Sequence, residues 1–487
     1  IGDGEIIVQN LAKAVKEKKT SSNDLSKILG ITYIDSKNKF KFTGYEHPLP
    51  ASMIKHPDYS ILEDDNCIDY YIRKGTEGYW AVDSYKWEED KKKATVMVAK
   101  GCVARCTFCH RFEKGYRVSP LDNVVNHLKI LKEKYNVKYL SIGDENFGSY
   151  KDETLKLVKV IKSMGFIWRA GGVRAHTIDL ETLKLWKEYG CINVTYGIES
   201  GSPTMLKVME KKISLEQNIK ALKFTYEAGL STCIQLIIGM PGETDKTIDE
   251  TIDFLLKVMP YYSDVWRNKV DLEVSFNYAQ ALPGTPLYEY ARECGFIGKD
   301  MDAEEDYLLK ISNTDAYDTE HFINCTQQPL LKVLSWRTRI YWKVFQAHAK
   351  TNLKISLSKL EIIRSLLIIS INQIFKIRLS SPLVRALDKF ETNRKKDAYY
   401  NTLNDKPFNY GLKLLLPWNK FTYPFIAVMI AFKESKNAKQ FLKLIFDHLK
   451  WSLSILKRVN LPKETLRKIV NIVDKVTDTS LKLREGR

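Results

Sequence analysis

TVMVAKGCVARCTFCH, residues 95–110, is the stretch that decides how the chain is interpreted. An apolar run of strand length, Thr95–Ala99, leads into a loop on which Cys102, Cys106 and Cys109 have C-x3-C-x2-C spacing. Thiolates are the ligands of iron–sulfur clusters, so these three cysteines could hold three irons of a [4Fe–4S] cube. The fourth iron would then be open to a small molecule. The loop therefore indicates a cofactor enzyme.

Two other interpretations of the same cysteines remain open. Zinc is also bound by thiolates, and His110 follows Cys109 directly. Adjacent residues rarely aim at one metal, so a fourth zinc ligand would have to come from a distant cysteine, none of which has C-x2-C spacing. The third interpretation is that the three thiols do not bind a common metal ion or cluster.

Composition limits the class of protein. A chain of 487 residues with 44% hydrophobic residues should form two or three domains with real cores. No apolar run reaches the roughly 20 residues of a membrane span, and no secretory signal is present. Eight cysteines without a paired framework favour a reducing cytoplasm, and an open iron favours an anaerobic or microaerobic cell. Because the chain begins at Ile1, we expect an N-terminally incomplete fragment.

The basic charge is confined to the C-terminal third. Residues 331–487 contain 32 Lys and Arg against 11 Asp and Glu, a net charge of +21, whereas residues 1–330 have a net charge of −4. Such a block suggests a membrane surface, a nucleic acid or a charged substrate as neighbour. A solvated basic face on a helical domain is the alternative. Leu and Ile interspersed with Lys favour a membrane surface or a lipid-linked substrate over a nucleic acid.

Strand-like runs alternate with amphipathic segments through the middle of the chain. The six runs are Thr95–Ala99, Val137–Ile142, Phe166–Ala170, Ile192–Tyr196, Ile234–Ile238 and Leu272–Tyr278. Six strand–helix units imply parallel strands, because each return needs a crossover, and six are too few for a closed eight-unit barrel. We therefore expect an α/β fold, a partial (β/α)6 barrel of the TIM type, with its chemistry in the loops after the strands.

Polar and small residues follow these strands, as a zwitterionic nucleoside cofactor would require. The residues concerned are Gly143, Asp144, Glu145, Arg174, Glu199, Ser200, Ile237 and Gly239, with Phe108 on the cysteine loop. An amino group needs acceptors, here the Gly143 carbonyl or the carboxylates after it. A carboxylate needs a cation such as Arg174. Ribose hydroxyls need polar partners such as Glu199 and Ser200.

An adenine needs an apolar slot with backbone groups, which Phe108, Ile237 and Gly239 could form. Each of these signals is weak alone, because glycine-rich turns are common after strands and Arg174 could be a salt-bridged rim residue. Their joint order on six strand–helix units is a strong signal. The sequence does not identify a catalytic residue beyond these ligands.

The cysteine loop, Gly143-Asp144-Glu145, Gly197–Ser202 and the Gly239-x-x-Gly-Glu243 turn resemble the radical S-adenosylmethionine (SAM) superfamily over about residues 90–290. Asp144 and Gln235 depart from the pattern, since each replaces a glycine. The resemblance implies a [4Fe–4S] cluster at Cys102, Cys106 and Cys109, and SAM bound at its open iron. It also implies reductive cleavage of SAM to a 5′-deoxyadenosyl radical.

The flanking segments are similar to the subgroup that has a cobalamin-binding domain and includes methyltransferases and the anaerobic magnesium-protoporphyrin ester cyclase. The similar segments are Ile1–Glu5 with the helix after it, the linker Pro48–Pro50 to Pro57–Tyr59, and Leu282–Leu287. No Asp-x-His-x-x-Gly stretch occurs, so cobalamin is expected only for the full-length protein. We expect residues 1–80 to be the remnant of that domain plus a linker, 81–295 the radical SAM core, 296–330 a connector and 331–487 a basic helical domain.

The resemblance implies methylation or oxidative cyclisation of a small-molecule or lipid-linked substrate. It also implies a reductant such as flavodoxin or ferredoxin. We expect a cytoplasmic protein, with peripheral membrane contact through the basic domain as an open alternative, and no nucleic-acid partner. Two other functions are weighed: an iron–sulfur electron carrier, which would usually have a fourth cysteine ligand, and a tRNA-modifying enzyme of the methylthiotransferase type, which usually has three further cysteines and a β-barrel tail.

Overall fold

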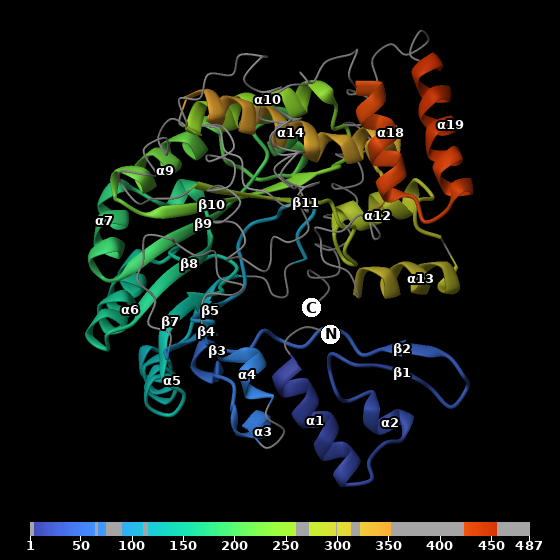
Figure 1. The fold of residues 1–487 in the computed structure, drawn as a ribbon. Helices are drawn as coiled ribbons and strands as arrows, with labels where there is room; N and C mark the ends of the chain where they lie inside the picture. Colours follow the sequence, from blue (N-terminus) through green and yellow to red (C-terminus); the bar gives the residue numbers. More distant parts are fainter. Residues whose placement is uncertain are drawn as a thin grey trace, which may run out of the picture.

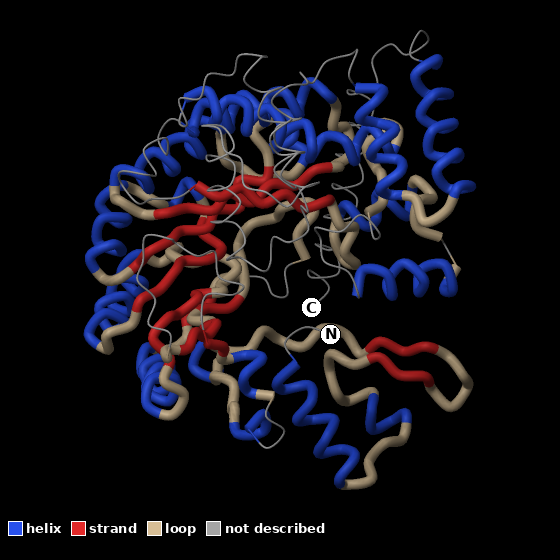
Figure 2. The backbone as a smooth tube through the Cα atoms, viewed as in Figure 1, coloured by secondary structure: helices blue, strands red, loops and turns tan. Residues whose placement is uncertain are grey.

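The computed structural model describes residues 4–63, 67–74, 90–110, 115–259, 272–298, 300–312, 322–351 and 423–454. Its centre is a curled sheet with strand order β11-β10-β9-β8-β7-β4-β3 (Figures 1 and 2). The six strands β4 (Lys92–Val96), β7 (Val137–Ile142), β8 (Ile167–Val173), β9 (Cys191–Glu199), β10 (Ser231–Ile238) and β11 (Leu272–Tyr278) are parallel. This confirms the predicted α/β fold with a partial barrel.

The first expected strand is divided in the structure. β4 ends at Val96, and the chain then leaves the sheet because the Val98 and Ala99 amides donate to Asp144 Oδ1, at 2.8 and 3.2 Å. The next residues form β5 (Ala99–Lys100), which pairs antiparallel with β6 (Arg117–Val118). At the sheet edge the two-residue strand β3 (Arg73–Lys74) pairs antiparallel with β4.

Helices cover the convex side of the sheet (Figure 1). They are α5 (Leu121–Glu133), α6 (Lys151–Ser163), α7 (Leu180–Glu188), α9 (Leu215–Glu227) and α10 (Asp245–Val258). The 3-10 turn η2 (Ala175–Thr177) follows β8, and the short helix α8 (Pro203–Val208) follows β9. Side chains cap two of these helices: Asp179 accepts from the Thr182 amide, and Ser214 forms a capping box with Gln217. At α5 the N-cap is Pro120, while the Ser119 amide donates to the Val98 carbonyl.

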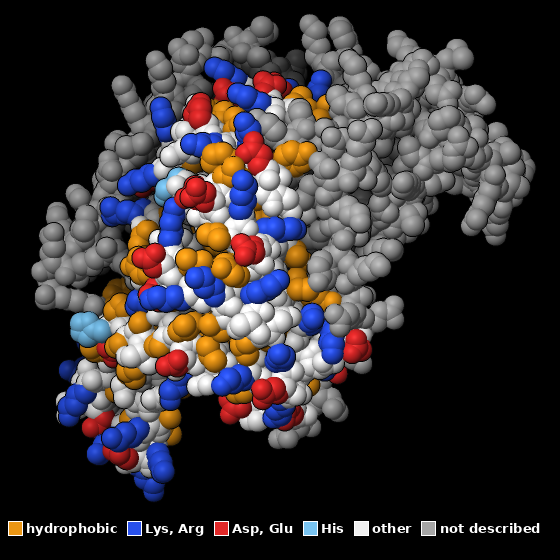
Figure 3. Space-filling view, turned by 90° about the vertical axis from the view of Figure 1, so that its left-hand side faces the viewer, with side chains coloured by type: hydrophobic (Ala, Val, Ile, Leu, Met, Phe, Trp, Pro, Cys, Tyr) orange, Lys and Arg blue, Asp and Glu red, His pale blue; other side chains and the backbone are white. Residues whose placement is uncertain are grey.

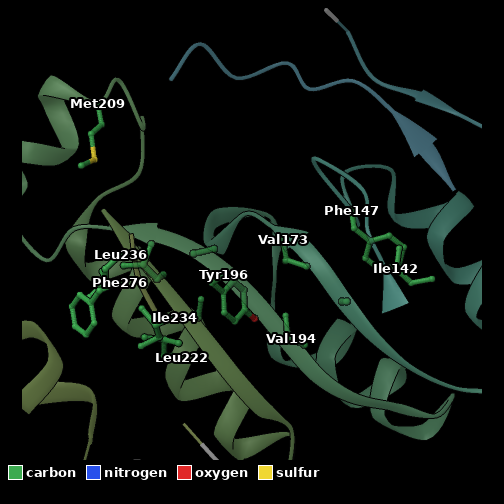
Figure 4. Packing of buried hydrophobic residues seen from close by; sticks show 14 of the residues in the cluster. Ile142, Phe147, Val173, Val194, Tyr196, Met209, Leu222, Ile234, Leu236 and Phe276 are labelled. Carbon is green, nitrogen blue, oxygen red and sulfur yellow. The ribbon is translucent and has the colours of Figure 1, made fainter. Parts of the chain in front are cut away.

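Buried hydrophobic residues lie on both faces of the sheet. Helices cover the outer face, and the curvature of the sheet encloses the inner face. Figure 4 shows Leu222 of α9 beside Ile234 of β10, and aliphatic side chains following one another along neighbouring strands. Trp168 is buried against Phe147 and Trp186, with ring centroids 5.7 Å from each. This packing fixes the strand ends on which the candidate site is built.

The N-terminal segment consists of short helices and one two-stranded sheet. The helix expected after Ile1–Glu5 is α1 (Gly4–Lys16), followed by α2 (Ser22–Leu25), and β1 (Thr32–Ile34) pairs with β2 (Phe40–Phe42). The residues that follow contain η1 (Ala51–Met53), α3 (Ser60–Glu63) and α4 (Ile68–Tyr71). His56 stacks on the buried His127 of α5 at 4.3 Å between ring centroids, and Tyr59 contacts the same histidine. These contacts hold the segment against the barrel.

C-terminal to β11 the described chain is helical. Its helices are α12 (Pro286–Glu293), α13 (Met301–Ser312), α14 (Leu330–Thr351), α18 (Tyr423–Glu434) and α19 (Ala438–Ser454). α14 packs on α10, where Trp336 Nε1 and Arg339 Nη1 donate to Asp245 Oδ1 at 2.8 and 3.0 Å. Residues 352–422 and 455–487 of the expected basic helical domain lie outside the described residues.

Charges of both signs are mixed on one face of the molecule. Figure 3 shows the face formed by the outer helices of the barrel, where Lys and Arg side chains are interspersed with Asp and Glu. Among the described helices, none has the length and apolar character needed to cross a membrane. The predicted boundaries at residues 80, 295 and 330 stay predictions.

Candidate functional site

The cysteine loop lies at the carboxyl end of β4, as predicted. Cys102 and Cys106 are buried, and Cys109 is exposed. Thr107 fixes the loop, because its amide donates to the Met209 carbonyl at 3.1 Å and its hydroxyl donates to the Val208 carbonyl at 2.9 Å. On the other side the Leu287 amide donates to the Thr107 carbonyl at 3.0 Å. The loop is therefore held between the end of α8 and the start of α12.

The three thiols lie within electrostatic reach of one another. Burial, and next to it the charges of Cys106 and Glu145, raises the pKa of the Cys109 thiol to about 12, with a smaller contribution from Cys102. Desolvation at the sulfur acts although one side of the residue is open to solvent. A thiol that binds a metal loses its proton to the metal charge. The donor set, three soft sulfurs on a fixed loop, fits an iron–sulfur cluster.

A cluster places different demands on its ligands than a single metal ion does. Within the described ranges, no group of three His, Cys, Asp or Glu side chains is gathered around a position for one metal ion. In a cube each cysteine binds a different iron, so the three sulfurs need to surround a cluster rather than one point. The His110 ring makes a different contact, because its Nδ1 lies 2.8 Å from the Pro283 carbonyl oxygen.

Asp144, after β7, holds the strand end to the cysteine loop. Its Oδ1 accepts both amides that leave β4, while Oδ2 is buried with no hydrogen-bond partner. Burial raises the pKa of Asp144 to about 7, although the two amide hydrogen bonds oppose this shift. Only Oδ2 of Asp144 is therefore left for the predicted contact with the SAM amino group, because Oδ1 holds the cysteine loop. Glu145 lies beside it, close enough for its charge to act on Cys109.

A buried ion pair lies behind the loop. Lys211 Nζ contacts Glu199 Oε1 at 2.8 Å, and the two side chains are only 9% and 10% exposed. Burial lowers the pKa of Lys211, but the charges of Glu199 and then Cys106 outweigh it and raise the pKa above its ordinary value. The ammonium group also lies 5.9 Å from the centroid of the Phe108 ring. Lys211 therefore joins the end of β9 to the cysteine loop.

Arg174 and Glu199 are brought to the same place. Arg174 Nη2 donates to the Lys211 carbonyl at 2.7 Å, which directs the guanidinium toward the ion pair. Glu199 has a φ of 66°, a left-handed conformation that a residue with a side chain adopts at a cost of about 1–3 kcal/mol. Such strain is typical of functional sites. Ser200 does not join this group, since its hydroxyl contacts Thr251 Oγ1 at 3.2 Å and accepts from the Ser202 amide at 3.0 Å.

The turn after β10 is held by a buried carboxylate. The Gly239 amide donates to Glu243 Oε2 at 2.5 Å. Burial raises the pKa of Glu243 to about 8, against the opposing effect of the Gly239 and Met240 amides. Ile237 is half-buried near the carboxyl end of β10, and Phe108 is half-buried on the cysteine loop.

Lys211 is the site residue that the sequence did not reveal. The pair Lys211-Lys212 precedes the Ser214 capping box and resembles any charged loop. Only the structure shows that the first lysine is buried and the second exposed. The sequence signal that could have marked Lys211 was a pair of lysines directly before a helix N-terminus, where positive charge is unfavourable.

A parallel half-barrel with three loop thiols, a strained glutamate and a buried ion pair at its carboxyl edge defines a cofactor-dependent enzyme. Residues 96–255 match the family model of the radical SAM superfamily, so this part of the chain is a radical SAM domain. Such domains use a [4Fe–4S] cluster and SAM, and the cysteine loop within the match provides ligands of the required kind.

Curated relatives extend the comparison. The chain is 30% identical over 299 residues to "Uncharacterized methyltransferase PH0819" of Pyrococcus horikoshii, covering 60% of this chain and 57% of that protein. It is 26% identical over 258 residues to the anaerobic magnesium-protoporphyrin IX monomethyl ester cyclase of Rubrivivax gelatinosus, covering 51% and 43%. The chain thus spans about half the length of these relatives.

Among solved structures, the cobalamin-dependent SAM radical enzyme OxsB aligns with a TM-score of 0.49 and 15% identity, covering 98% of this chain and 67% of that one.

Proposed function

We propose that this chain cleaves SAM reductively at a cluster held by Cys102, Cys106 and Cys109. When bound, the cluster would supply the electron that breaks the sulfonium bond. The observation that carries the proposal is the anchored cysteine loop, which presents two buried thiols and Cys109 and whose Phe108 ring lies beside the Lys211–Glu199 pair. The fold would fix the loop through Thr107 and exclude water around the two buried thiols.

The residues around the loop suit a zwitterionic nucleoside. Arg174 would place its positive charge near the SAM carboxylate, and the Gly143 carbonyl with Glu145 would accept from the amino group. Glu199 would accept from ribose hydroxyls while Lys211 holds its carboxylate in place. Phe108, Ile237 and Gly239 would contact the adenine. The Ser200 hydroxyl would act on the turn rather than on ribose, because its hydrogen bonds lie within the fold.

For the whole protein we propose methylation or oxidative cyclisation of a small or lipid-linked molecule. The support is the similarity to relatives described as a methyltransferase and as an ester cyclase. Cobalamin is proposed as a further cofactor, and the support is the sequence resemblance of residues 1–80 to the cobalamin-binding subgroup. Peripheral membrane contact of the basic C-terminal domain in the cytoplasm is supported by its net charge of +21.

The test is anaerobic reconstitution with iron and sulfide, followed by reduction with dithionite in the presence of SAM. We expect 5′-deoxyadenosine to form, because the open iron binds SAM and passes one electron to it. Cys106→Ala should lose both cluster absorbance and product. Intact SAM beside a reduced wild-type cluster would contradict the proposal and favour the electron-carrier function.

A further inference from the structure

Helix α19 is apolar on two faces, one packed and one exposed. Phe441 and Leu444 pack against the small core that α14 and α18 form together. Leu442, Phe446 and Leu449 instead have exposed fractions of 64%, 66% and 54%. At about 3.6 residues per turn, these three positions follow one another along one side of the helix. Single exposed apolar side chains are ordinary, but an exposed apolar stripe marks an interaction surface.

The apolar stripe lies where a large partner can reach it. Figure 1 shows α19 at the margin of the molecule, on the far side of α18 from the barrel. α18 contacts α19 and adds exposed apolar side chains of its own, Met429 and Phe432. The two helices therefore present apolar surface at the outside of the molecule.

A row of lysines runs beside the apolar stripe. Lys439, Lys443 and Lys450 are exposed and follow one another along the helix next to the stripe. The exposed Asp447 lies beyond this row, farther from the stripe, and Lys436, two residues before the helix, adds a fourth exposed lysine. The local excess of positive charge agrees in sign with the net charge of +21 for residues 331–487. The surface therefore selects an anionic partner.

The apolar stripe and the lysine row together fit a lipid surface better than they fit other partners. Apolar side chains at headgroup depth, beside lysines whose stems reach the phosphates, are typical of an interfacial amphipathic helix. A nucleic acid would contact the lysines and leave the stripe in water. A second copy of the chain would bring its own lysine row to the same surface. With 17 residues and four charged side chains, α19 would lie along a bilayer rather than cross it.

We propose that α19 binds the surface of a bilayer containing anionic lipids. Leu442, Phe446 and Leu449 enter the boundary between headgroups and acyl chains, and the lysine row contacts the headgroup phosphates. The inference deepens the peripheral membrane contact proposed above, since it assigns the helix, its face and the charge of the lipid. An enzyme held there meets a lipid-linked substrate at the bilayer surface.

The test measures co-sedimentation of the reconstituted full chain with vesicles of phosphatidylcholine, or of phosphatidylcholine and phosphatidylglycerol in equal parts. The apolar variant is Leu442→Gln/Phe446→Gln. Its control makes the same kind of change at exposed isoleucines of α3 and α5, in Ile61→Gln/Ile130→Gln.

The charge variant is Lys443→Gln/Lys450→Gln, and its control is Lys159→Gln/Lys184→Gln on exposed lysines of α6 and α7. We expect the wild type and both controls to bind the anionic vesicles, and to bind the neutral vesicles about tenfold more weakly. Each α19 variant should bind the anionic vesicles about tenfold more weakly than its control. High salt should remove most of the difference between the charge variant and the wild type.

The outcomes separate this inference from the proposals on which it rests. A wild type that binds neither kind of vesicle would overturn membrane contact altogether, and binding that both α19 variants retain would overturn the role of α19. A lower melting temperature of the apolar variant than of its control would show that another part of the chain covers the stripe. A wild-type dimer that dissociates in the apolar variant would show that a second copy covers it, and either result would overturn the proposal. Formation of 5′-deoxyadenosine with dithionite, measured without vesicles, tests SAM cleavage independently.

Discussion

Lys211 carries a charge into the interior, where its Nζ forms an ion pair with Glu199 Oε1 at 2.8 Å. A buried charge is tolerated when it is paired, and it is strongly destabilising when the partner is removed. The pair also lies between the cysteine loop and the Arg174 side chain. At the scale of single residues, this ion pair is where stability and cofactor binding are coupled.

Lys211→Met should lower the free energy of unfolding by about 3–5 kcal/mol, because it leaves the Glu199 carboxylate buried and unpaired. Lys211→Met/Glu199→Gln should recover most of that loss, since both charges are gone. Denaturant titration of the apoprotein measures the effect. Lys207→Met, at an exposed position, is the matched control and should change stability by less than about 0.5 kcal/mol. Equal stability of Lys211→Met and the control would contradict this account.

Glu243 should make stability depend on pH. Its pKa is about 8 in the native state against 4.5 in the unfolded chain. Between these values the unfolded state loses the proton that the native state keeps, so the carboxyl group destabilises the fold as pH rises. Glu243→Gln removes this titration and retains an acceptor for the Gly239 amide.

The stability of Glu243→Gln relative to the wild type should therefore increase between pH 5 and pH 8, by a few kcal/mol at most. Urea unfolding of both proteins at the two pH values measures it. A difference that stays constant across this range would show that Glu243 is ionised in the native protein.

At the scale of elements, the strands were predicted better than their ends. β7 and β11 have the predicted bounds, because their apolar runs end where the sheet ends. The first run was predicted to continue to Ala99, but β4 ends at Val96. The cause is the Asp144 carboxylate, which takes the amides that a strand would offer to its neighbour. That competition comes from a residue 45 positions away along the chain, so local apolar periodicity could not reveal it.

The β10–α10 turn gives a test of element geometry. Gly239 has a φ of 95°, and a Cβ atom there would collide with the Phe322 ring. Gly229, at the end of α9, has a φ of 70° and open space around it. Gly239→Ala should lower the melting temperature clearly more than Gly229→Ala, which bears only the conformational cost of about 1 kcal/mol.

Phe322→Leu should reduce the extra loss in Gly239→Ala, because the shorter side chain leaves room for the new methyl group. Thermal unfolding of Gly239→Ala, of Phe322→Leu and of the Gly239→Ala/Phe322→Leu double variant measures this. Equal melting temperatures for the two alanine variants would mean that the turn relaxes away from Phe322.

At the scale of the whole molecule, the sequence predicted which strand ends meet, since parallel strands bring their carboxyl ends to one edge. It thereby placed the cysteine loop, Asp144, Arg174 and Glu199 in one region, as the structure does. It could not predict that Lys211 is buried or that Ser200 faces Thr251, because both follow from packing between distant segments. Which face of α19 stays exposed likewise depends on how that helix packs on α14 and α18.

The central claim is that one iron of the cluster has no protein ligand and binds SAM. The direct measurement is electron paramagnetic resonance of the reduced, reconstituted protein with SAM carrying ¹⁵N in its amino group. The account predicts a [4Fe–4S] signal that changes on SAM addition and shows coupling to the labelled nitrogen. A signal that SAM leaves unchanged, or a protein that retains zinc in place of iron at these cysteines, would contradict it.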